Sequence, residues 1–282
     1  MVKTYFPCSL KEALTIRKET SAMPYAGGTD LMVKNKSWGG ALPKFSRDIL
    51  YIGDLEELKG ISTDQDKIVI GAATKLSSIV NSIQIPDYIR RPIRSIGSPA
   101  IRNLGSIGGN ICNASPAGDS LPCLYALNAK LELSSNERKR LVAISEYIKG
   151  PGKTILGEDE LLTKIIIPVD SFNIWRFEKT GSRKANAIAK LSVFMATRLR
   201  EGSIEDIRIA FGALGPVVVR SHEIEKILLG ASLSKEAGLL DEVIGMYNTE
   251  ISPITDVRST KDYRRSTAIG ILKEMLQKEL IL

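Results

Sequence analysis

Residues 26–31 read Ala-Gly-Gly-Thr-Asp-Leu, and residues 106–119 read Ser-Ile-Gly-Gly-Asn-Ile-Cys-Asn-Ala-Ser-Pro-Ala-Gly-Asp. Each stretch contains two adjacent glycines, and a strand is predicted over 23–26, directly before the first pair. Because glycine has no Cβ, neighbouring backbone N–H groups can approach a phosphate closely, and Thr29 adds a hydroxyl donor. Either stretch alone is typical of a structural turn. Together they favour a site that holds both phosphates of a dinucleotide without a Rossmann helix.

The second glycine stretch lies in a segment without charge. No charged residue occurs from Asn103 to Gly118, although a loop that faces water normally carries charged side chains. We therefore expect a long loop that packs against another part of the protein.

Other signatures for nucleotide, metal or nucleophile chemistry are absent from the sequence. The dinucleotide motif G-x-G-x-x-G does not occur. Gly152-Lys153-Thr154 resembles the end of a P-loop, but Tyr147 stands where the first glycine is required, so we interpret it as a turn. The single histidine, His222, cannot build a His-rich metal site, and no G-x-S-x-G elbow is present for a triad. Three cysteines are fewer than the four thiolates that an iron–sulfur cluster normally needs.

The composition is that of an ordinary globular chain of 282 residues, with a net charge of +7 and 43% hydrophobic residues. The densest basic group, Arg138-Lys139-Arg140, is predicted as the solvated tip of a hairpin. Aromatic residues make up 6% and do not interleave with basic ones, so no stacking platform for single-stranded nucleic acid is indicated. No apolar run approaches the ~20 residues that span a bilayer, and an odd cysteine count suits a reducing compartment. We expect a soluble, cytoplasmic protein.

Turn signals and hydrophobic periodicity divide the chain near residue 170. Ser9 and Glu12 form an S-x-x-E capping box that opens the first helix. Thr74 is predicted to cap another helix, which carries Leu76, Ile79, Val80 and Ile83. After Val169, three strands (174–177, 188–199 and 204–211) precede three helices (around 222–229, 235–247 and 261–280). This order indicates a separate α+β domain from about residue 171.

The two glycine stretches resemble those of the flavin-binding (medium) subunit of the molybdenum hydroxylases. This family includes carbon monoxide, nicotinate, aldehyde and bacterial xanthine dehydrogenases. The resemblance covers nearly the whole chain and implies an α+β fold that begins with a two-lobed FAD-binding domain of the PCMH type over 1–170. Its subdomains would be about 1–55 and 56–170. Residues 171–282 would form a C-terminal domain of the CO dehydrogenase flavoprotein type, with a three-stranded antiparallel sheet and a helical bundle.

The resemblance also implies a set of FAD contacts. The first stretch would wrap the pyrophosphate and ribityl region, the second would form another wall, and Asp119 would bind the cofactor through its carboxylate. Ile96 matches an apolar contact, Leu161 a backbone or apolar contact, and Lys179 a cationic contact. The full implied set is Ala26, Gly27, Gly28, Thr29, Asp30, Leu31, Ile96, Ser106, Ile107, Gly108, Gly109, Asn110, Asp119, Leu161 and Lys179.

The function implied by the resemblance is electron transfer within a complex. FAD in this chain would take electrons from the [2Fe-2S] clusters of a small subunit and pass them to an external acceptor, while a large molybdopterin subunit hydroxylates the substrate. A heterotrimer, or a dimer of heterotrimers, is implied. We expect no catalytic side chain and no metal ligand in this chain, which lacks the cysteine-rich insertion of some members. His222 is far from both stretches in sequence, so we expect non-covalent FAD.

Two other functions remain open at this stage. A stand-alone FAD-dependent reductase of similar fold, of the enolpyruvyl-glucosamine reductase type, would need a substrate domain with its own proton donor, and the sequence offers no persuasive one. A non-catalytic nucleotide-binding or assembly protein would hold a flavin that cannot be reduced. The sequence identifies neither the substrate of the complex nor the final electron acceptor.

Overall fold

The computed structural model describes residues 2–36, 44–64, 66–232 and 237–280. Within these residues, no helix combines the length and the apolar character needed to cross a membrane. The chain folds into two compact units that interleave along the sequence. The first unit consists of Met1–Ile85, Ser98–Ala114 and Ala129–Pro168, and the second of Pro86–Gly97, Ser115–Asn128 and Val169–Leu282.

The first unit begins with a parallel sheet of order β1-β3-β2, made of β1 (Thr4–Tyr5), β3 (Ile49–Tyr51) and β2 (Met23–Tyr25). Helix α1 (Leu10–Thr20) connects β1 to β2. Ser9 Oγ accepts from the Glu12 amide at 3.2 Å, and the Glu12 carboxylate accepts from the Cys8 amide at 2.7 Å. The capping box is therefore confirmed as the start of this helix.

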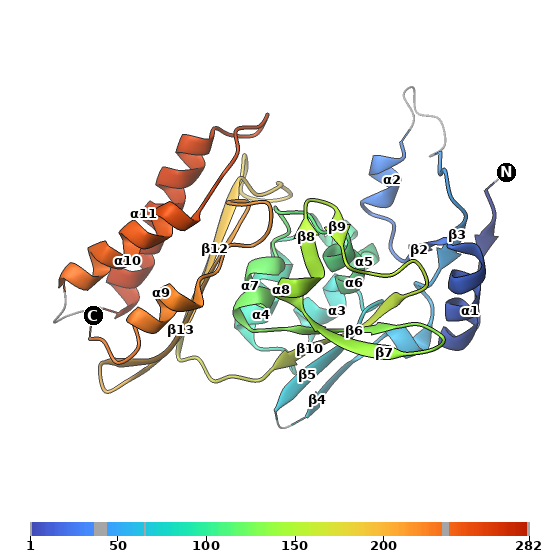
Figure 1. The fold of residues 1–282 in the computed structure, drawn as a ribbon, viewed down its shortest axis with the longest axis horizontal. Helices are drawn as coiled ribbons and strands as arrows, with labels where there is room; N and C mark the ends of the chain where they lie inside the picture. Colours follow the sequence, from blue (N-terminus) through green and yellow to red (C-terminus); the bar gives the residue numbers. More distant parts are fainter. Residues whose placement is uncertain (1, 37–43, 65, 233–236, 281–282) are drawn as a thin grey trace. The chain divides into compact units, whose positions relative to one another are not determined.

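A five-stranded antiparallel sheet of order β4-β5-β10-β6-β7 forms the centre of the first unit (Figure 1). In the central strand β10, Ile165 pairs with Ile70 of β5 on one side and with Leu131 of β6 on the other. All three side chains are at most 1% exposed, so the middle of the sheet carries the core. The strands are β4 (Ile61–Asp64), β5 (Lys67–Gly71), β6 (Lys130–Ser134), β7 (Lys139–Ala143) and β10 (Leu161–Pro168), with a separate hairpin of β8 (Ile148–Gly150) and β9 (Lys153–Thr154).

Short helices complete the first unit: α2 (Leu31–Lys34), η1 (Glu56–Leu58), α3 (Leu76–Asn81), α5 (Pro99–Leu104), α6 (Ile107–Cys112) and α8 (Ile144–Tyr147). The prediction for α3 is wrong at both ends. The Thr74 hydroxyl does not cap the helix, because it donates to the Gly60 carbonyl at 3.0 Å. The helix ends before Ser82, which is extended, and Ile83 lies outside it with 94% exposure.

The uncharged segment is not the long loop that we expected, because it contains the end of α5 and all of α6. Gly108 and Gly109 are poor helix formers, and both lie in the first turn of α6. Ser106 offsets part of this by accepting from the Gly109 amide at 3.1 Å, and the side chains of Ile107 and Ile111 are at most 1% exposed. Tertiary packing therefore outweighs helix propensity here.

The second unit is built on the antiparallel sheet β11-β12-β13, with β11 (Ile174–Thr180), β12 (Leu191–Arg200) and β13 (Ser203–Gly212). Helices α9 (His222–Ile227), α10 (Ala237–Glu250) and α11 (Lys261–Leu280) follow and pack with the sheet (Figure 1). Their common core includes Val193, Phe211, Tyr247 and Leu272. The predicted order of three strands and then three helices is confirmed.

Two earlier helices, α4 (Asp87–Arg94) and α7 (Leu121–Ala126), also belong to the second unit. The Tyr88 hydroxyl of α4 donates to the Asp170 carbonyl at 3.0 Å. Arg208 of β13 pairs with the Asp170 carboxylate at 2.9 Å and stacks 4.9 Å from the centre of the Phe172 ring. These contacts fix α4 and the segment before β11 to the sheet.

Candidate functional site

The first glycine stretch leaves β2 and turns into α2. Gly28 has a φ of +66°, a left-handed conformation that glycine adopts without strain. The amide N–H groups of residues 27–31 donate to no atom among the described residues. A row of unused backbone donors is the arrangement that binds a phosphate group.

In the first unit, the first glycine stretch lies against Leu104 and Gly105, which directly precede the second stretch. A Cβ on Gly27 would stand 1.9 Å from the Leu104 carbonyl oxygen, so this approach requires glycine. Lys34, at the end of α2, adds a bridge, since its Nζ lies 2.8 Å from Asp30 Oδ2 and 2.5 Å from Asn113 Oδ1. The structure thus brings together two stretches that are far apart in sequence.

The second stretch uses the amides of residues 107–109 within the protein. The Gly108 amide donates to the Ala72 carbonyl at 2.8 Å, and the Ile107 amide to another carbonyl at 3.1 Å. The Gly109 amide donates to Ser106 Oγ at 3.1 Å. These bonds occupy the amide donors in the first turn of α6, which would otherwise be available to an anion. The amides in the first turn of α6 are therefore occupied, and this turn supplies a wall.

The two glycines of α6 have different surroundings. A Cβ on Gly108 would lie 2.7 Å from both Cβ and the carbonyl oxygen of Ala72, so Gly108 packs the helix onto the sheet. Gly109 is exposed, and a Cβ there would meet only Ser106 Oγ, at 3.0 Å. Space for a bound group along the second stretch therefore lies next to Gly109.

Asp119 and Lys179, both in the second unit, form an ion pair. Lys179 Nζ donates to Asp119 Oδ2 at 2.5 Å and to the Ser95 carbonyl at 3.0 Å, and the two side chains are 13% and 7% exposed. Burial raises the pKa of Asp119 to about 6, and Lys179 and Ser95 limit that rise. Asp119 Oδ1 is buried and accepts no hydrogen bond from the residues described. Sequence reasoning named both residues but missed their contact.

The remaining two implied contacts lie elsewhere. Ile96 follows α4 in the second unit, next to Ser95, and is half-buried. Leu161 opens β10 in the first unit, and its side chain is 1% exposed in a core with Ala13 and Leu50. A ligand contact with Leu161 would therefore use the main chain.

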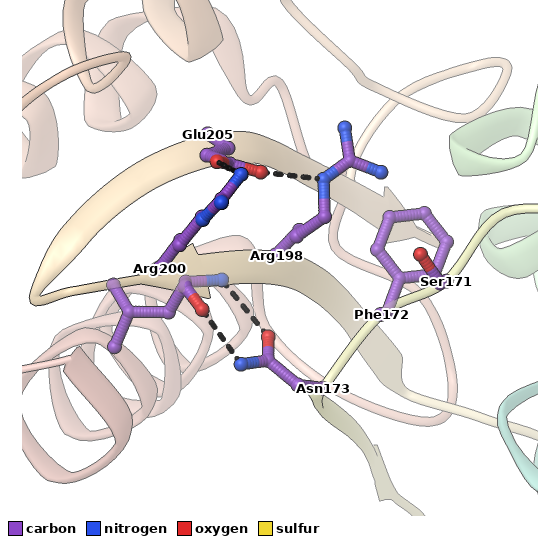
Figure 2. A pocket seen from close by; sticks show the side chains of 7 residues that line it. Ser171, Phe172, Asn173, Arg198, Arg200 and Glu205 are labelled. Carbon is purple, nitrogen blue, oxygen red and sulfur yellow. Dashed lines mark hydrogen bonds and ion pairs between the residues drawn. The ribbon is translucent and has the colours of Figure 1, made fainter.

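A hollow of about 370 Å³ in the second unit contains none of the predicted residues. Figure 2 shows the side chains that line it. Arg198 and Arg200 both pair with Glu205, at 3.1 and 3.5 Å. Asn173 exchanges two hydrogen bonds with the Leu199 main chain, each 2.8 Å long. These contacts tie the β12–β13 hairpin to the segment before β11. Among the described residues, no group of His, Cys, Asp and Glu could hold a metal ion.

The residues present fit a bound FAD. In the first unit, the unused amides of the first stretch suit an anionic pyrophosphate. In the second unit, taken by itself, the unpaired Asp119 Oδ1 suits a hydroxyl or amine donor. His222, the only histidine, starts α9 with a 63% exposed side chain, and its Nδ1 lies 3.3 Å from Glu225 Oε2.

Comparisons with known proteins agree with this fit. The family described as "FAD binding domain in molybdopterin dehydrogenase" matches residues 1–170, and "CO dehydrogenase flavoprotein C-terminal domain" matches residues 176–278. The chain is 34% identical over 263 residues to the glyceraldehyde dehydrogenase medium chain of Sulfolobus acidocaldarius, covering 91% of this chain and 90% of the relative. It is 30% identical over 271 residues to the carbon monoxide dehydrogenase medium chain of Afipia carboxidovorans, covering 94% and 91%. The solved structure of reconstituted CO dehydrogenase from Oligotropha carboxidovorans matches with a TM-score of 0.89 at 26% identity, covering 99% and 97% of the two chains.

The fold and the glycine-stretch site thus define a flavoprotein of the oxidoreductase class. The chain belongs to the family of FAD-binding medium subunits of the molybdenum hydroxylases. The family and the fold implied by the two glycine stretches are confirmed. A subunit function is also favoured over a stand-alone reductase, since the relatives are named as medium chains and FAD-binding subunits.

Proposed function

We propose that this chain is the FAD-binding electron-transfer subunit of a heteromeric molybdenum hydroxylase. It would pass electrons from the [2Fe-2S] clusters of a partner subunit to an external acceptor. Bound FAD would supply the redox chemistry by accepting electrons one at a time and delivering them in pairs. The observation that carries the proposal is the row of unused amide donors at residues 27–31.

The protein's part is to bind and orient the cofactor. The amides of residues 27–31 and the Thr29 hydroxyl would donate to the pyrophosphate, with Ala26 bordering this stretch. Residues 106–110 would form the second wall, where the exposed Gly109 leaves room for the ligand. The contacts assigned to Ile96 and Leu161 stay predictions.

Asp119 would bind the cofactor through Oδ1, because Lys179 already holds Oδ2 at 2.5 Å. The lysine orients the carboxylate and stabilises its negative charge in a buried position. Neither residue needs to exchange a proton with the hydroxylated substrate, whose chemistry would take place in the molybdenum subunit.

A large molybdopterin-binding subunit and a small [2Fe-2S] subunit are the partners that we propose, in a cytoplasmic heterotrimer or a dimer of heterotrimers. The names of two relatives as medium chains support companions of larger and smaller size. Within this chain, residues 1–170 (about 1–55 and 56–170) would serve as the FAD-binding domain and residues 171–282 as the C-terminal domain.

Reconstitution of the purified chain tests the binding function. The chain should bind FAD, and acid precipitation should release the flavin into the supernatant. FMN should bind far more weakly, because it lacks the second phosphate. Colour that stays in the pellet would contradict non-covalent binding, and tight binding of FMN would contradict the pyrophosphate role of residues 27–31.

Turnover assays test the subunit role. With an artificial acceptor, the isolated FAD-loaded chain should oxidise none of carbon monoxide, glyceraldehyde, xanthine and nicotinate. Oxidation of any of them by this chain alone, without metal, would favour the stand-alone reductase.

A further inference from the structure

A groove of about 710 Å³ lies in the first unit, between α1 and the five-stranded sheet. Its lining comes from α1, η1, β6, β7, β10 and the turn between β6 and β7, and it includes none of the implied FAD contacts. Small-molecule sites have volumes of about 300–1,000 Å³ and combine an apolar wall with a few convergent polar groups. The groove has this volume, and Leu10 and Leu14 of α1 supply the apolar wall.

The two carboxylates of the groove are already satisfied within the chain. Glu57 Oε1 accepts from the Leu10 amide at 2.9 Å, at the start of α1. Glu132 Oε1 accepts from the Thr163 hydroxyl at 2.8 Å and lies 3.3 Å from the Lys164 ammonium. A cationic ligand would therefore have to compete with groups of the protein for both carboxylates.

The position of Thr163 depends on an irregularity in β10. The pairing of β10 with β6 shifts between Leu162 and Lys164, so Thr163 is an extra residue in the strand. Bulges of this kind re-aim side chains and are frequent next to functional sites. Thr163 is 1% exposed, and its hydroxyl also lies 3.1 Å from Ser134 Oγ. The sheet therefore gives the groove a floor of buried polar atoms with fixed positions.

Three hydrogen-bond donors of the groove remain unused. The ammonium groups of Lys11 and Lys139 make no hydrogen bond or ion pair with the described residues. Ser135 Oγ accepts from the Glu137 and Arg138 amides, each at 3.3 Å, but its hydroxyl donates to none of the described residues. Ser135 is only 7% exposed. A buried hydroxyl and two ammonium groups without acceptors suit an anionic group of a ligand.

Contacts between α1 and the β6–β7 turn fix the walls of the groove. Asn136 Nδ2 donates to Thr15 Oγ1 at 3.1 Å, and Lys18 Nζ lies 2.6 Å from Glu137 Oε1. A site whose walls are already fixed loses little conformational freedom when a ligand binds.

We infer that this groove binds a small organic anion, with a carboxylate or phosphate monoester on an apolar body. The lining contains three lysines and two glutamates. Because Lys164 and the Leu10 amide match the glutamates, the charges left for a ligand are those of Lys11 and Lys139. These two ammonium groups and the Ser135 hydroxyl would donate to the anionic group, and the apolar wall would contact the body of the ligand.

Calorimetric titration of the FAD-loaded chain with benzoate and with phenyl phosphate tests this inference. At least one of these aromatic anions should bind saturably, and the tighter of the two identifies the anionic group as carboxylate or phosphate. Benzylamine, a cation of similar size, should not bind, and inorganic phosphate should bind more weakly than phenyl phosphate because it lacks the apolar body. The Kd of the aromatic anion should rise with salt.

Lysine variants locate the bound anion. Lys139→Gln and Lys11→Gln should each raise the Kd of the aromatic anion by about tenfold, because each removes one charged donor. Lys149→Gln is the matched control, since this lysine of β8 is exposed and lies outside the groove, and it should leave the Kd unchanged. All three variants should keep the wild-type melting temperature and FAD content.

The outcomes distinguish the groove from the proposed function. A chain that binds neither aromatic anion, a wild-type Kd for Lys139→Gln, or benzylamine that binds as tightly as benzoate would overturn the inference and leave the subunit role intact. Binding of the anion only to the chain without FAD would also overturn it, by making the groove part of the FAD site. A chain that fails to bind FAD would contradict the proposed function, and the same titration of that chain and its Lys139→Gln variant would still test the groove.

Discussion

Lys179 Nζ lies 2.5 Å from Asp119 Oδ2, although the two residues are 60 positions apart in sequence. Lys179 belongs to β11 and Asp119 precedes α7, and both are in the second unit. The contact occupies one carboxylate oxygen and leaves the other, Oδ1, buried without a donor among the described residues. A buried acceptor of this kind is costly unless a ligand group satisfies it.

Asp119→Asn should weaken FAD binding and remove its dependence on pH in mild acid. Burial raises the pKa of Asp119 to about 6, so the free protein takes up a proton as the pH falls through that value. If the ionised carboxylate binds FAD, the wild-type Kd should rise by about tenfold per pH unit below it. Fluorescence titrations of both proteins at a series of pH values measure this. A wild-type Kd that does not change with pH would remove the Asp119 carboxylate from the binding site.

The same ionisation should appear in the stability of the chain without FAD. Burial raises the pKa of Asp119 from 3.8 to about 6 in the folded state, so the folded protein binds this proton more readily than the unfolded one. The stabilisation is fully present below the unfolded pKa and is lost as the pH rises through the folded pKa. The free energy of unfolding of the wild type, relative to Asp119→Asn, should therefore increase from about pH 7 to about pH 4. Urea unfolding measures it, and a relative stability that decreases towards acid would show that the pKa is not raised.

Substitutions should show that Gly27 supports the fold and that Gly109 faces the ligand. Gly27→Ala should lower the free energy of unfolding by roughly 3 kcal/mol, because its Cβ would meet the Leu104 carbonyl oxygen at 1.9 Å. Gly109→Val should change that free energy by less than about 1 kcal/mol, since only Ser106 Oγ is near. It should nevertheless raise the Kd for FAD by about tenfold or more. Urea unfolding and FAD titration of each variant make the comparison, and normal FAD binding by Gly109→Val would mean that the ligand does not face this glycine.

Lys34→Gln should weaken FAD binding with little effect on the fold. Its side chain is 55% exposed, so the ion pair with Asp30 contributes little to stability. It nevertheless joins the two stretches through Asp30 and Asn113, and its loss should leave the first stretch less ordered before FAD binds. We expect the Kd to rise by several-fold, with no further rise when Asn113→Ala is added. A double-mutant cycle on FAD affinity checks this, and independent, additive losses would contradict the bridge.

Signals that depend on neighbouring residues predicted the local structure. Ser9 and Glu12 cap α1 as expected, and the three strands predicted after Val169 are found in the predicted order, before three helices. Thr74 failed as a cap because its hydroxyl bonds to Gly60, fourteen positions away. Helix α6 was also not predicted, because its two adjacent glycines have low helix propensity. The helix forms because its buried face packs against the rest of the unit.

The sequence predicted which residues belong to the candidate site but not how these residues contact one another in the fold. The glycine pairs predict phosphate-binding amides in both stretches. The Gly108 amide instead donates to the Ala72 carbonyl, which only the folded sheet brings close to it. Segments 86–97 and 115–128 belong to the second unit, and no local sequence pattern predicts this assignment. The contacts of the individual residues with FAD stay predictions.

Electron transfer from a reduced iron–sulfur partner to the flavin of this chain tests the central claim most directly. The FAD-loaded chain is mixed without oxygen, in a stopped-flow spectrometer, with the chemically reduced form of the proposed iron–sulfur subunit. We predict that the absorbance of oxidised flavin falls as the cluster spectrum returns to its oxidised form, and that the chain without FAD leaves the clusters reduced. A complex that forms while its flavin stays oxidised would contradict the electron-transfer role.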